Sequence, residues 1–248
     1  MEIFKSGLLP FRHGITFSKD QSPKTSKEMK RMRRVPYAEA VGSLIYVMLY
    51  TRPDINFAVW MVSRYQSNHG PKHWTVVKHI MKYLKITKNY MLVYSGDELI
   101  PAGYTDSDFM SDKDSRKSTS DYVFTLGSGA IIWKSVKQFC IVDSTTEAEY
   151  VVASEGAKKD VWLHKFLQDL EVVHVITVPL KLFCDNSSAV AQSKEPKNHK
   201  KQKHIEMKYH LIRDIVQRSD VEVTQIASQQ NLVDPFTRPY LGNLLTCT

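Results

Sequence analysis

Four acidic residues of this sequence stand where a folded chain would turn them toward one edge of a sheet. Asp106 lies near the end of the strand-like run IPAGYTDSDF, and Asp185 closes the run VPLKLFCDN. Glu149 lies in the first turns of a helix that begins near Ser144, and Asp234 lies at a short terminal helix. Ligands of open α/β sheets bind at the carboxyl ends of the strands. We therefore expect the four carboxylates to converge.

Converging carboxylates would repel one another unless a cation lay between them. Mg²⁺ takes oxygen ligands and keeps water molecules that can face the phosphates of a substrate. Two such ions, roughly 3.5–4 Å apart, stabilise both the attacking and the leaving oxygen of an in-line phosphoryl displacement. The acid pattern therefore favours metal-assisted phosphoryl chemistry.

Each acid also has an ordinary structural explanation. Asp106 and Asp185 follow strands, where aspartate is common in turns and at helix N-caps. Asp234 can likewise be an N-cap. Glu147 matches a capping box with the serine three residues before it, and the helix dipole can account for Glu149. Spacing alone leaves these alternatives open.

The composition indicates a folded, basic protein. The 248 residues include 34 Lys and Arg against 26 Asp and Glu, for a net charge of +8. This balance suggests a nucleic-acid partner, or only a basic surface. Three cysteines without a CxxC pair argue against a disulfide framework or a zinc finger and for a reducing compartment. No apolar run reaches the roughly 18 residues of a membrane span, and no signal peptide is recognisable, so we expect an intracellular protein, in cytoplasm or nucleus, without a membrane partner.

The hydrophobic pattern divides the chain into three parts. Residues 1–36 form a polar, basic arm with a short basic helix. Residues 37–98 form a small helical unit, in which Pro53 suits the start of the second helix. The third helix is expected to carry a stripe of Trp74, Val77, Ile80, Met81 and Leu84. Residues 99–242 read as β-β-β-α-β-α-α-β-α, which predicts an α/β fold with a mixed sheet and helices on its faces.

The pattern of residues 99–242 also predicts the first three strands and the buried face of the long helix. The first three strands are expected at IPAGYTDSDF, DYVFTLGSGAIIWKS and KQFCIVDS, as a meander. The long helix after Ser144 is expected to turn its apolar positions toward the core. These positions are Val151, Val152, Trp162, Phe166, Leu167 and Leu170.

Five motifs occur in an order that is typical of one family. They are YTDSDFMSDKDSRKSTSDYVFTLGSGAIIWKS, STTEAEYVVASEGAKKDVWL, LFCDNSSAV, KHIEMKYHLIRD and NLVDPFTRP. Together they resemble the ribonuclease H domain of copia-type LTR retrotransposon Pol polyproteins. The helical part upstream is similar to the thumb or connection region between the reverse-transcriptase palm and ribonuclease H. The resemblance covers nearly the whole chain.

The resemblance implies a ribonuclease H-like α/β fold, with a mixed five-stranded sheet flanked by helices. It also implies hydrolysis of the RNA strand of RNA–DNA hybrids with two Mg²⁺ ions, Mn²⁺ being possible. By motif, Asp106 would bridge the metals, Glu149 would be the helix ligand, and Asp185 and Asp234 would complete the set. Asp108 is the alternative to Asp106, because both lie on one face of a strand. The implied partners are the hybrid and the remaining segments of the polyprotein.

Basic residues near two of the motifs are candidate phosphate contacts, which would make binding depend steeply on salt. They are Lys200, Lys201, Lys203 and His204 in the run KEPKNHKKQKHIEMKYH, and Arg116 and Lys117 in RKSTS. The alternative is that both segments are ordinary solvated loops.

The sequence also departs from the family. The family usually has Gly where Asp121 stands, Ala where Val233 stands, and Leu or Ile where Pro235 stands. No YxDD polymerase motif is present, so we do not expect polymerisation. The departures leave a second hypothesis, a catalytically inactive remnant that binds nucleic acid, and a weaker third, an interaction protein that only presents a surface.

Overall fold

The computed structural model describes residues 10, 17–94, 100–127, 129–170, 179–195, 211–233 and 246–247. The chain forms two compact units, one of residues 1–93 with 238–248 and the other of residues 94–237. Within the described ranges no helix is long and apolar enough to cross a membrane. Asp106, Glu149 and Asp185 all belong to the second unit.

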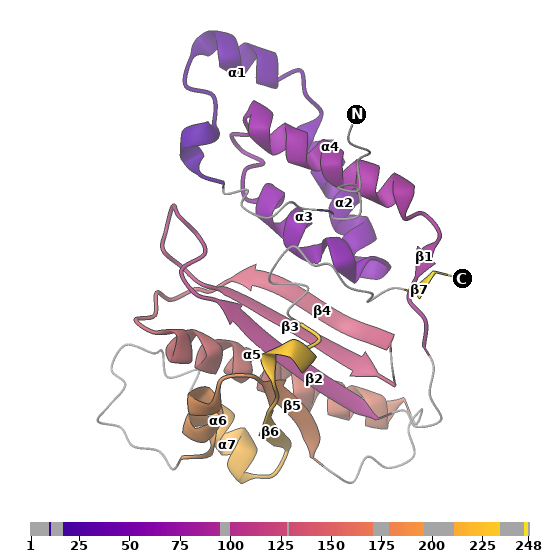
Figure 1. Cartoon of the computed structure of the whole chain (residues 1–248), viewed down its shortest axis with the longest axis vertical. Helices are drawn as coiled ribbons and strands as arrows, with labels where there is room; N and C mark the ends of the chain where they lie inside the picture. The colour runs from indigo at the N-terminus through magenta and orange to yellow at the C-terminus, as the bar shows by residue number, and fades with distance from the viewer. Residues whose placement is uncertain are drawn as a thin grey trace. The chain divides into compact units, whose positions relative to one another are not determined.

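A mixed sheet forms the centre of the second unit (Figure 1). The elements of this unit are β2 (Pro101–Asp108), β3 (Thr119–Leu126), β4 (Gly129–Lys137), α5 (Thr145–Asp169), β5 (Leu180–Cys184), α6 (Ser187–Lys194), α7 (Leu211–Gln217), β6 (Val221–Gln225) and η4 (Ser228–Gln230). The strand order is β4-β3-β2-β5-β6. β4, β3 and β2 pair antiparallel, whereas β2, β5 and β6 pair in parallel. The mixed five-stranded sheet flanked by helices that the resemblance implies is therefore confirmed.

The meander turns at a different place from the one expected. β3 and β4 both come from DYVFTLGSGAIIWKS, which the sequence pattern treats as one strand. The chain reverses at Gly127, whose φ of 60° lies in the left-handed region that glycine adopts without steric cost. The prediction of a third strand at KQFCIVDS is wrong, because β4 ends at Lys137. There the buried amide of Gln138 donates to the carbonyl oxygen of Ala148 at 3.0 Å, which ties the segment to the start of α5.

One stripe of α5 faces the sheet, and its positions are three or four residues apart. The buried members of the stripe are Glu149, Ala153, Gly156, Asp160, Leu163 and Leu167. A Cβ atom added to Gly156 would lie 2.8 Å from Cγ2 of Thr105, which is closer than real contacts allow. Glycine therefore permits a close approach of α5 to β2.

Three of the apolar residues predicted to face the core do not. Trp162, Phe166 and Leu170 are 48%, 44% and 50% exposed, so the prediction is wrong for these positions. They lie on the flank of α5, away from its buried stripe. There the rings of Trp162 and Phe166 stack with centroids 5.1 Å apart, and Nζ of Lys159 lies 3.5 Å from the centroid of Trp162. Val151, Val152 and Leu167 are buried as predicted.

The first unit is built mainly from helices. Its elements are η1 (Lys19–Gln21), α1 (Ser26–Met32), α2 (Tyr37–Tyr50), η2 (Pro53–Ile55), α3 (Asn56–Ser63), α4 (Pro71–Ile86) and the antiparallel pair β1 (Tyr90–Met91) and β7 (Thr246–Cys247). Pro53 begins η2, the 3-10 turn that leads into α3. In α4 the expected stripe is shifted: Val77 and Ile80 are buried, but Met81 is 38% exposed and His73 is buried instead.

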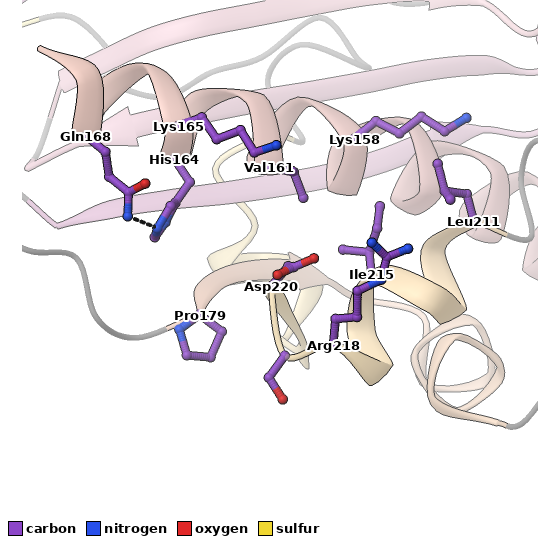
Figure 2. Close-up of a pocket in the computed structure, with 11 residues that line it drawn as sticks. Lys158, Val161, His164, Lys165, Gln168, Pro179, Leu211, Ile215, Arg218 and Asp220 are labelled. Carbon is purple, nitrogen blue, oxygen red and sulfur yellow. Dashed lines mark hydrogen bonds between the residues drawn. The ribbon is translucent and has the colours of Figure 1, made fainter.

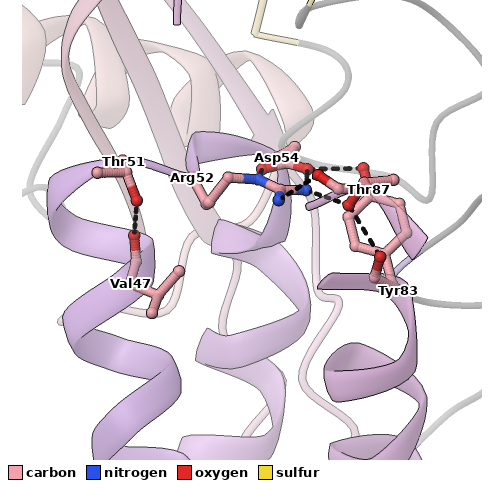
Figure 3. Close-up of polar contacts among 6 residues, drawn as sticks. All are labelled: Val47, Thr51, Arg52, Asp54, Tyr83 and Thr87. Carbon is pink, nitrogen blue, oxygen red and sulfur yellow. Dashed lines mark hydrogen bonds and ion pairs between the residues drawn. The ribbon is translucent and has the colours of Figure 1, made fainter. Parts of the chain in front are cut away.

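A buried polar network joins the corner between α2 and η2 to the end of α4 (Figure 3). Arg52 donates from Nε and Nη2 to the two carboxylate oxygens of Asp54, at 2.9 and 2.7 Å. The same guanidinium donates to the carbonyl oxygen and to Oγ1 of Thr87, at 3.1 and 2.6 Å. Tyr83 donates its hydroxyl to Asp54 at 2.6 Å. Burial raises the pKa of Tyr83, and the charge of Asp54 adds to this, so the phenol stays a donor.

We expect Arg52→Lys to lower the free energy of unfolding by about 2 kcal/mol, since hydrogen bonds to charged groups contribute roughly 1.5–3 kcal/mol. Lysine keeps the charge but cannot reproduce the planar fork that reaches Asp54 and Thr87 together. Urea unfolding of the full chain measures the loss. The matched control is Arg33→Lys on the exposed end of α1. Equal midpoints for the two variants would contradict a stabilising role for the network.

Candidate active site

Two of the predicted carboxylates meet because β2 and β5 run in parallel. Thr105 of β2 is the register partner of Cys184, the last residue of β5. The following residues, Asp106 and Asp185, therefore stand at adjacent strand positions. Asp106 is 7% exposed and Asp185 is half-buried. Asp108, the alternative to Asp106, lies two residues further along β2, so the register favours Asp106 as the neighbour of Asp185.

Glu149 reaches the same strand ends from α5. Its Oε1 accepts hydrogen bonds from the backbone N–H of Ser107 at 3.0 Å and from the Ser107 hydroxyl at 2.8 Å. Its Oε2 lies 3.8 Å from Sγ of Cys184. The side chain is buried, with 5% exposure. These contacts hold the carboxylate at the ends of β2 and β5.

The two glutamates at the start of α5 have different surroundings. Oγ of Ser144 accepts from the backbone N–H of Glu147 at 3.2 Å, and Oε2 of Glu147 accepts from the N–H of Asp143 at 2.8 Å. Glu147 therefore satisfies backbone donors at the helix start. Two residues along a helix correspond to a rotation of about 200°. Glu149 consequently points toward the sheet, while Glu147 points away from it.

Burial raises the pKa of Glu149 to about 8, and the charges of Asp106 and Asp185 add to the effect. The hydrogen bonds from Ser107 act in the opposite direction, because they stabilise the carboxylate. Burial, together with the charges of Glu149 and Asp185, also raises the pKa of the Cys184 thiol, which therefore stays protonated. The site thus concentrates negative charge that a cation would offset.

The donor atoms of this site fit a hard divalent cation. One ligand atom each of Glu149, Cys184 and Asp185 lies within 4.8 Å of the others. Asp106 adds a carboxylate close enough to raise the pKa of Glu149. Mg²⁺ and Mn²⁺ take oxygen ligands, whereas metals that prefer sulfur need a thiolate. Because the thiol is protonated, the carboxylates are the ligands that these residues offer.

The other predicted site residues fall into two groups. Asp234, Lys200, Lys201, Lys203 and His204 lie outside the described residues. Arg116 and Lys117 lie in the loop between β2 and β3. Nζ of Lys117 donates to the carbonyl oxygen of Phe139, so this cation has a structural partner. Arg116 is exposed, and its backbone N–H donates to the carbonyl oxygen of Asp112 at 2.7 Å within the loop.

Sequence reasoning missed Ser107 and Cys184. Ser107 lies between Asp106 and Asp108 in YTDSD, and side chains alternate between the two faces of a strand. A residue between two candidate ligands therefore faces the helix that covers the sheet, and this signal was present in the sequence. Cys184 gives no such signal, because it reads as an ordinary apolar residue of a buried strand.

A cavity of about 680 Å³ lies elsewhere in the second unit, between α5 and α7 (Figure 2). Its cationic lining residues are Lys158, Lys165 and Arg218. Pro179 and Asp220 also line it, and they directly precede β5 and β6. The cavity is therefore at the amino ends of these strands, whereas Asp185 follows the carboxyl end of β5. It is separate from the carboxylate site.

Comparison with known proteins identifies the family. The chain is 42% identical over 229 residues, 92% of its length, to the retrovirus-related Pol polyprotein from transposon TNT 1-94 of Nicotiana tabacum. The chain belongs to the copia-type retrotransposon Pol polyproteins. The Pol polyprotein from transposon RE1 of Arabidopsis thaliana is 35% identical over 82% of the chain. The chain spans 17% and 14% of the length of these two relatives.

Other comparisons cover part of the Pol segment. The secreted RxLR effector protein 161 of Plasmopara viticola is 41% identical over 134 residues, which are 53% of this chain and 94% of that protein. Among solved structures, LC11-RNase H1 is similar over 56% of this chain and 92% of its own, with 16% identity and a TM-score of 0.41. No family model matches the chain.

The raised pKa of Glu149 predicts how the stability of this Pol segment depends on pH without divalent cations. Between its ordinary pKa of 4.5 and about 8, the group is ionised in the unfolded chain and protonated in the folded one. The folded state then binds more protons, so the free energy of unfolding falls as the pH rises and levels off above about 8. Asp160, whose pKa burial raises to about 7, contributes in the same direction below pH 7.

Glu149→Gln tests this assignment. Between about pH 7 and 8 wild type should lose up to about 1.4 kcal/mol per pH unit, and the variant should lose much less. Urea unfolding in the presence of chelator measures both slopes. Glu147→Gln, in the same turn of α5 but at its cap, is the matched control and should keep the wild-type slope. Parallel curves for wild type and Glu149→Gln would show that Glu149 is not the titrating group.

Proposed function

We propose that this Pol segment is a metal-dependent endonuclease that hydrolyses the RNA strand of RNA–DNA hybrids. The observation that carries the proposal is the proximity of Glu149 and Asp185 at the carboxyl ends of β2 and β5, where Asp106 stands at the adjacent strand position. Carboxylate oxygens gathered at one place suit hard divalent cations and, through them, phosphate chemistry. Membership of the Pol family supports a nucleic-acid substrate.

In this proposal Asp106, Glu149 and Asp185 hold Mg²⁺ or Mn²⁺, and Asp234 completes the ligand set. Divalent cations bound there would activate a water molecule and stabilise the charge that develops on the scissile phosphate. Ser107 fixes the direction of the Glu149 carboxylate through two donated hydrogen bonds. The protonated Cys184 adds no further negative charge to the site.

The basic residues would hold the nucleic acid. Arg116 presents an exposed guanidinium in the loop that follows β2, the strand that carries Asp106. Lys200, Lys201, Lys203 and His204 are proposed to contact further phosphates, together with Lys117. The net charge of +8 suits a polyanionic partner. We further propose that residues 37–98 are the thumb or connection region and that other segments of the polyprotein are partners of this chain.

Cleavage of an end-labelled RNA–DNA hybrid by the purified full chain tests the proposal. With Mg²⁺ or Mn²⁺ the RNA strand alone should be cut, and chelator should abolish the reaction. Glu149→Gln and Asp185→Asn should each lower the rate by at least about 100-fold, because even residues that only orient metal ligands typically cost 10–100-fold. Glu147→Gln is the matched control and should keep most of the activity, since its carboxylate bonds to the backbone of Asp143.

Two other outcomes would overturn parts of the proposal. A rate unchanged in Glu149→Gln and Asp185→Asn would refute the site assignment. A folded wild-type protein that binds the hybrid in a salt-sensitive way, but does not cut it with either metal, would establish the alternative: an inactive remnant that binds nucleic acid.

A further inference from the structure

The cavity between α5 and α7 takes no part in the proposed chemistry, yet it has the size and lining of a ligand site. Its volume of about 680 Å³ falls within the roughly 300–1,000 Å³ that is usual for small-molecule sites. Neighbouring lining residues of α5 are three or four positions apart, which places them on one side of the helix. They are Lys158, Val161, His164, Lys165 and Gln168.

The end of α7 holds Arg218 at the opposite side of the cavity. The backbone N–H of Ser219 donates to the carbonyl oxygen of Val216 at 3.0 Å, and that of Asp220 donates to the carbonyl oxygen of Ile215 at 3.2 Å. With Ser219 at a φ of 60°, these bonds form a Schellman motif, in which Arg218 is the C-cap. The turn therefore fixes the backbone of Arg218, and Figure 2 shows its side chain directed toward α5.

The lining of the cavity carries more positive than negative charge. Lys165 and Arg218 face it from its two sides, and Lys158 is a third cationic lining residue. Asp220 is the one acid among the lining residues that the structure describes. Neither Lys165 nor Arg218 forms an ion pair with an acid in the described part of the chain. Ammonium and guanidinium groups in this arrangement favour an anionic ligand, and the guanidinium fork matches a phosphate group in particular.

His164 provides an independent observation. Its Nε2 lies 2.7 Å from Nε2 of Gln168, so one ring nitrogen has a partner. The other, Nδ1, is buried and has no hydrogen-bond partner among the residues that the structure describes. The great majority of buried polar atoms have a partner, so this nitrogen indicates a ligand or a water molecule beside His164.

The remaining part of the lining is apolar. Ile215 is buried, Val161 and Pro179 are half-buried, and Leu211 is 39% exposed. A ligand that fills the cavity therefore needs an uncharged body as well as an anionic group. A nucleoside phosphate has both, because its base has flat apolar faces and polar edges that a ring nitrogen or an amide can hydrogen-bond.

We propose that this cavity binds the phosphate monoester of a nucleoside. Lys165 and Arg218 hold the phosphate from opposite sides, and Val161 and Ile215 contact the base. His164 donates to or accepts from a polar atom of the ligand. The phosphate belongs either to a free mononucleotide or to the 5′ end of a nucleic-acid strand. This inference goes beyond the proposed function, because the cavity shares no residue with the carboxylate site.

Isothermal titration calorimetry of the full chain with adenosine 5′-monophosphate tests the proposal. Chelator is present throughout, so that no divalent cation at the carboxylate site can hold the phosphate. Wild type should bind the nucleotide at one saturable site. Lys165→Gln and Arg218→Gln should each weaken binding by at least about tenfold, the lower end of what a hydrogen bond to a charged group contributes. Both side chains are exposed, so the variants should unfold at the wild-type temperature.

Two further variants distinguish the cavity from the basic surface as a whole. Val161→Phe narrows the cavity without changing the charge and should weaken binding. Lys181→Gln removes an exposed lysine of β5 that does not line the cavity, and it should keep the wild-type affinity. Equal weakening in Lys181→Gln and Lys165→Gln would refute the site, since the net charge of +8 alone would then explain binding. Adenosine that binds as tightly as its monophosphate would refute the role of the two cations.

A DNA tetranucleotide with a 5′-phosphate, compared with the same strand without it, identifies the source of the phosphate. Binding of the monophosphate supports a free mononucleotide, whereas binding of the phosphorylated strand alone supports a strand end. Either result must be lost in Arg218→Gln. If neither ligand binds saturably, the proposal is refuted. Lys165→Gln and Arg218→Gln should cut the RNA–DNA hybrid at the wild-type rate, so the failure of the nuclease assay and the failure of this inference are distinguishable.

Discussion

The burial of like charges at the ends of β2 and β5 constrains the rest of the second unit. A carboxylate that leaves water loses its solvation, and each further carboxylate nearby makes ionisation harder. Ser107 opposes this cost by donating two hydrogen bonds to Glu149. These two hydrogen bonds require α5 to lie close to the sheet. Gly156 permits this close approach because it has no side chain, and it lies two turns beyond Glu149 on the same stripe of α5. Packing far from the site therefore determines whether the carboxylate reaches it.

The sequence predicts the elements of the second unit well where apolar periodicity and caps agree. Ser144 and Glu147 mark the start of α5, and the strand ends place Asp106 and Asp185 side by side. The two aspartates lie side by side because β2 and β5 are parallel and end at paired residues, so the residues that follow the two strands are also adjacent. The sequence could not predict which flank of α5 is buried, because two acids, Glu149 and Asp160, stand on the inward stripe while Trp162 stands outside it.

The remaining errors also have local causes. The run from Asp121 to Ser135 looks continuous by composition, and only the left-handed conformation at Gly127 divides it into two strands. β4 ends just before Gln138, whose side chain bonds to the start of α5. This is a tertiary contact, so the strand propensity of the sequence does not predict it. The two residues that contact Glu149 also differ in how far the sequence reveals them. Ser107 is recognisable from alternation, whereas Cys184 joins the site only because its strand ends beside Thr105.

The two units balance buried charge in different ways. In the first unit the carboxylate of Asp54 has its counter-charge within the chain, because Arg52 forks onto it and Tyr83 donates a further hydrogen bond. In the second unit Asp106 has an aspartate, Asp121, as its register partner on β3. In the proposed nuclease site, a divalent cation bound at the ends of β2 and β5 would supply positive charge to the carboxylates gathered there. The acids that are costly to bury are then the same acids that the proposed chemistry needs, so the stability of the second unit and its chemistry depend on the same carboxylates.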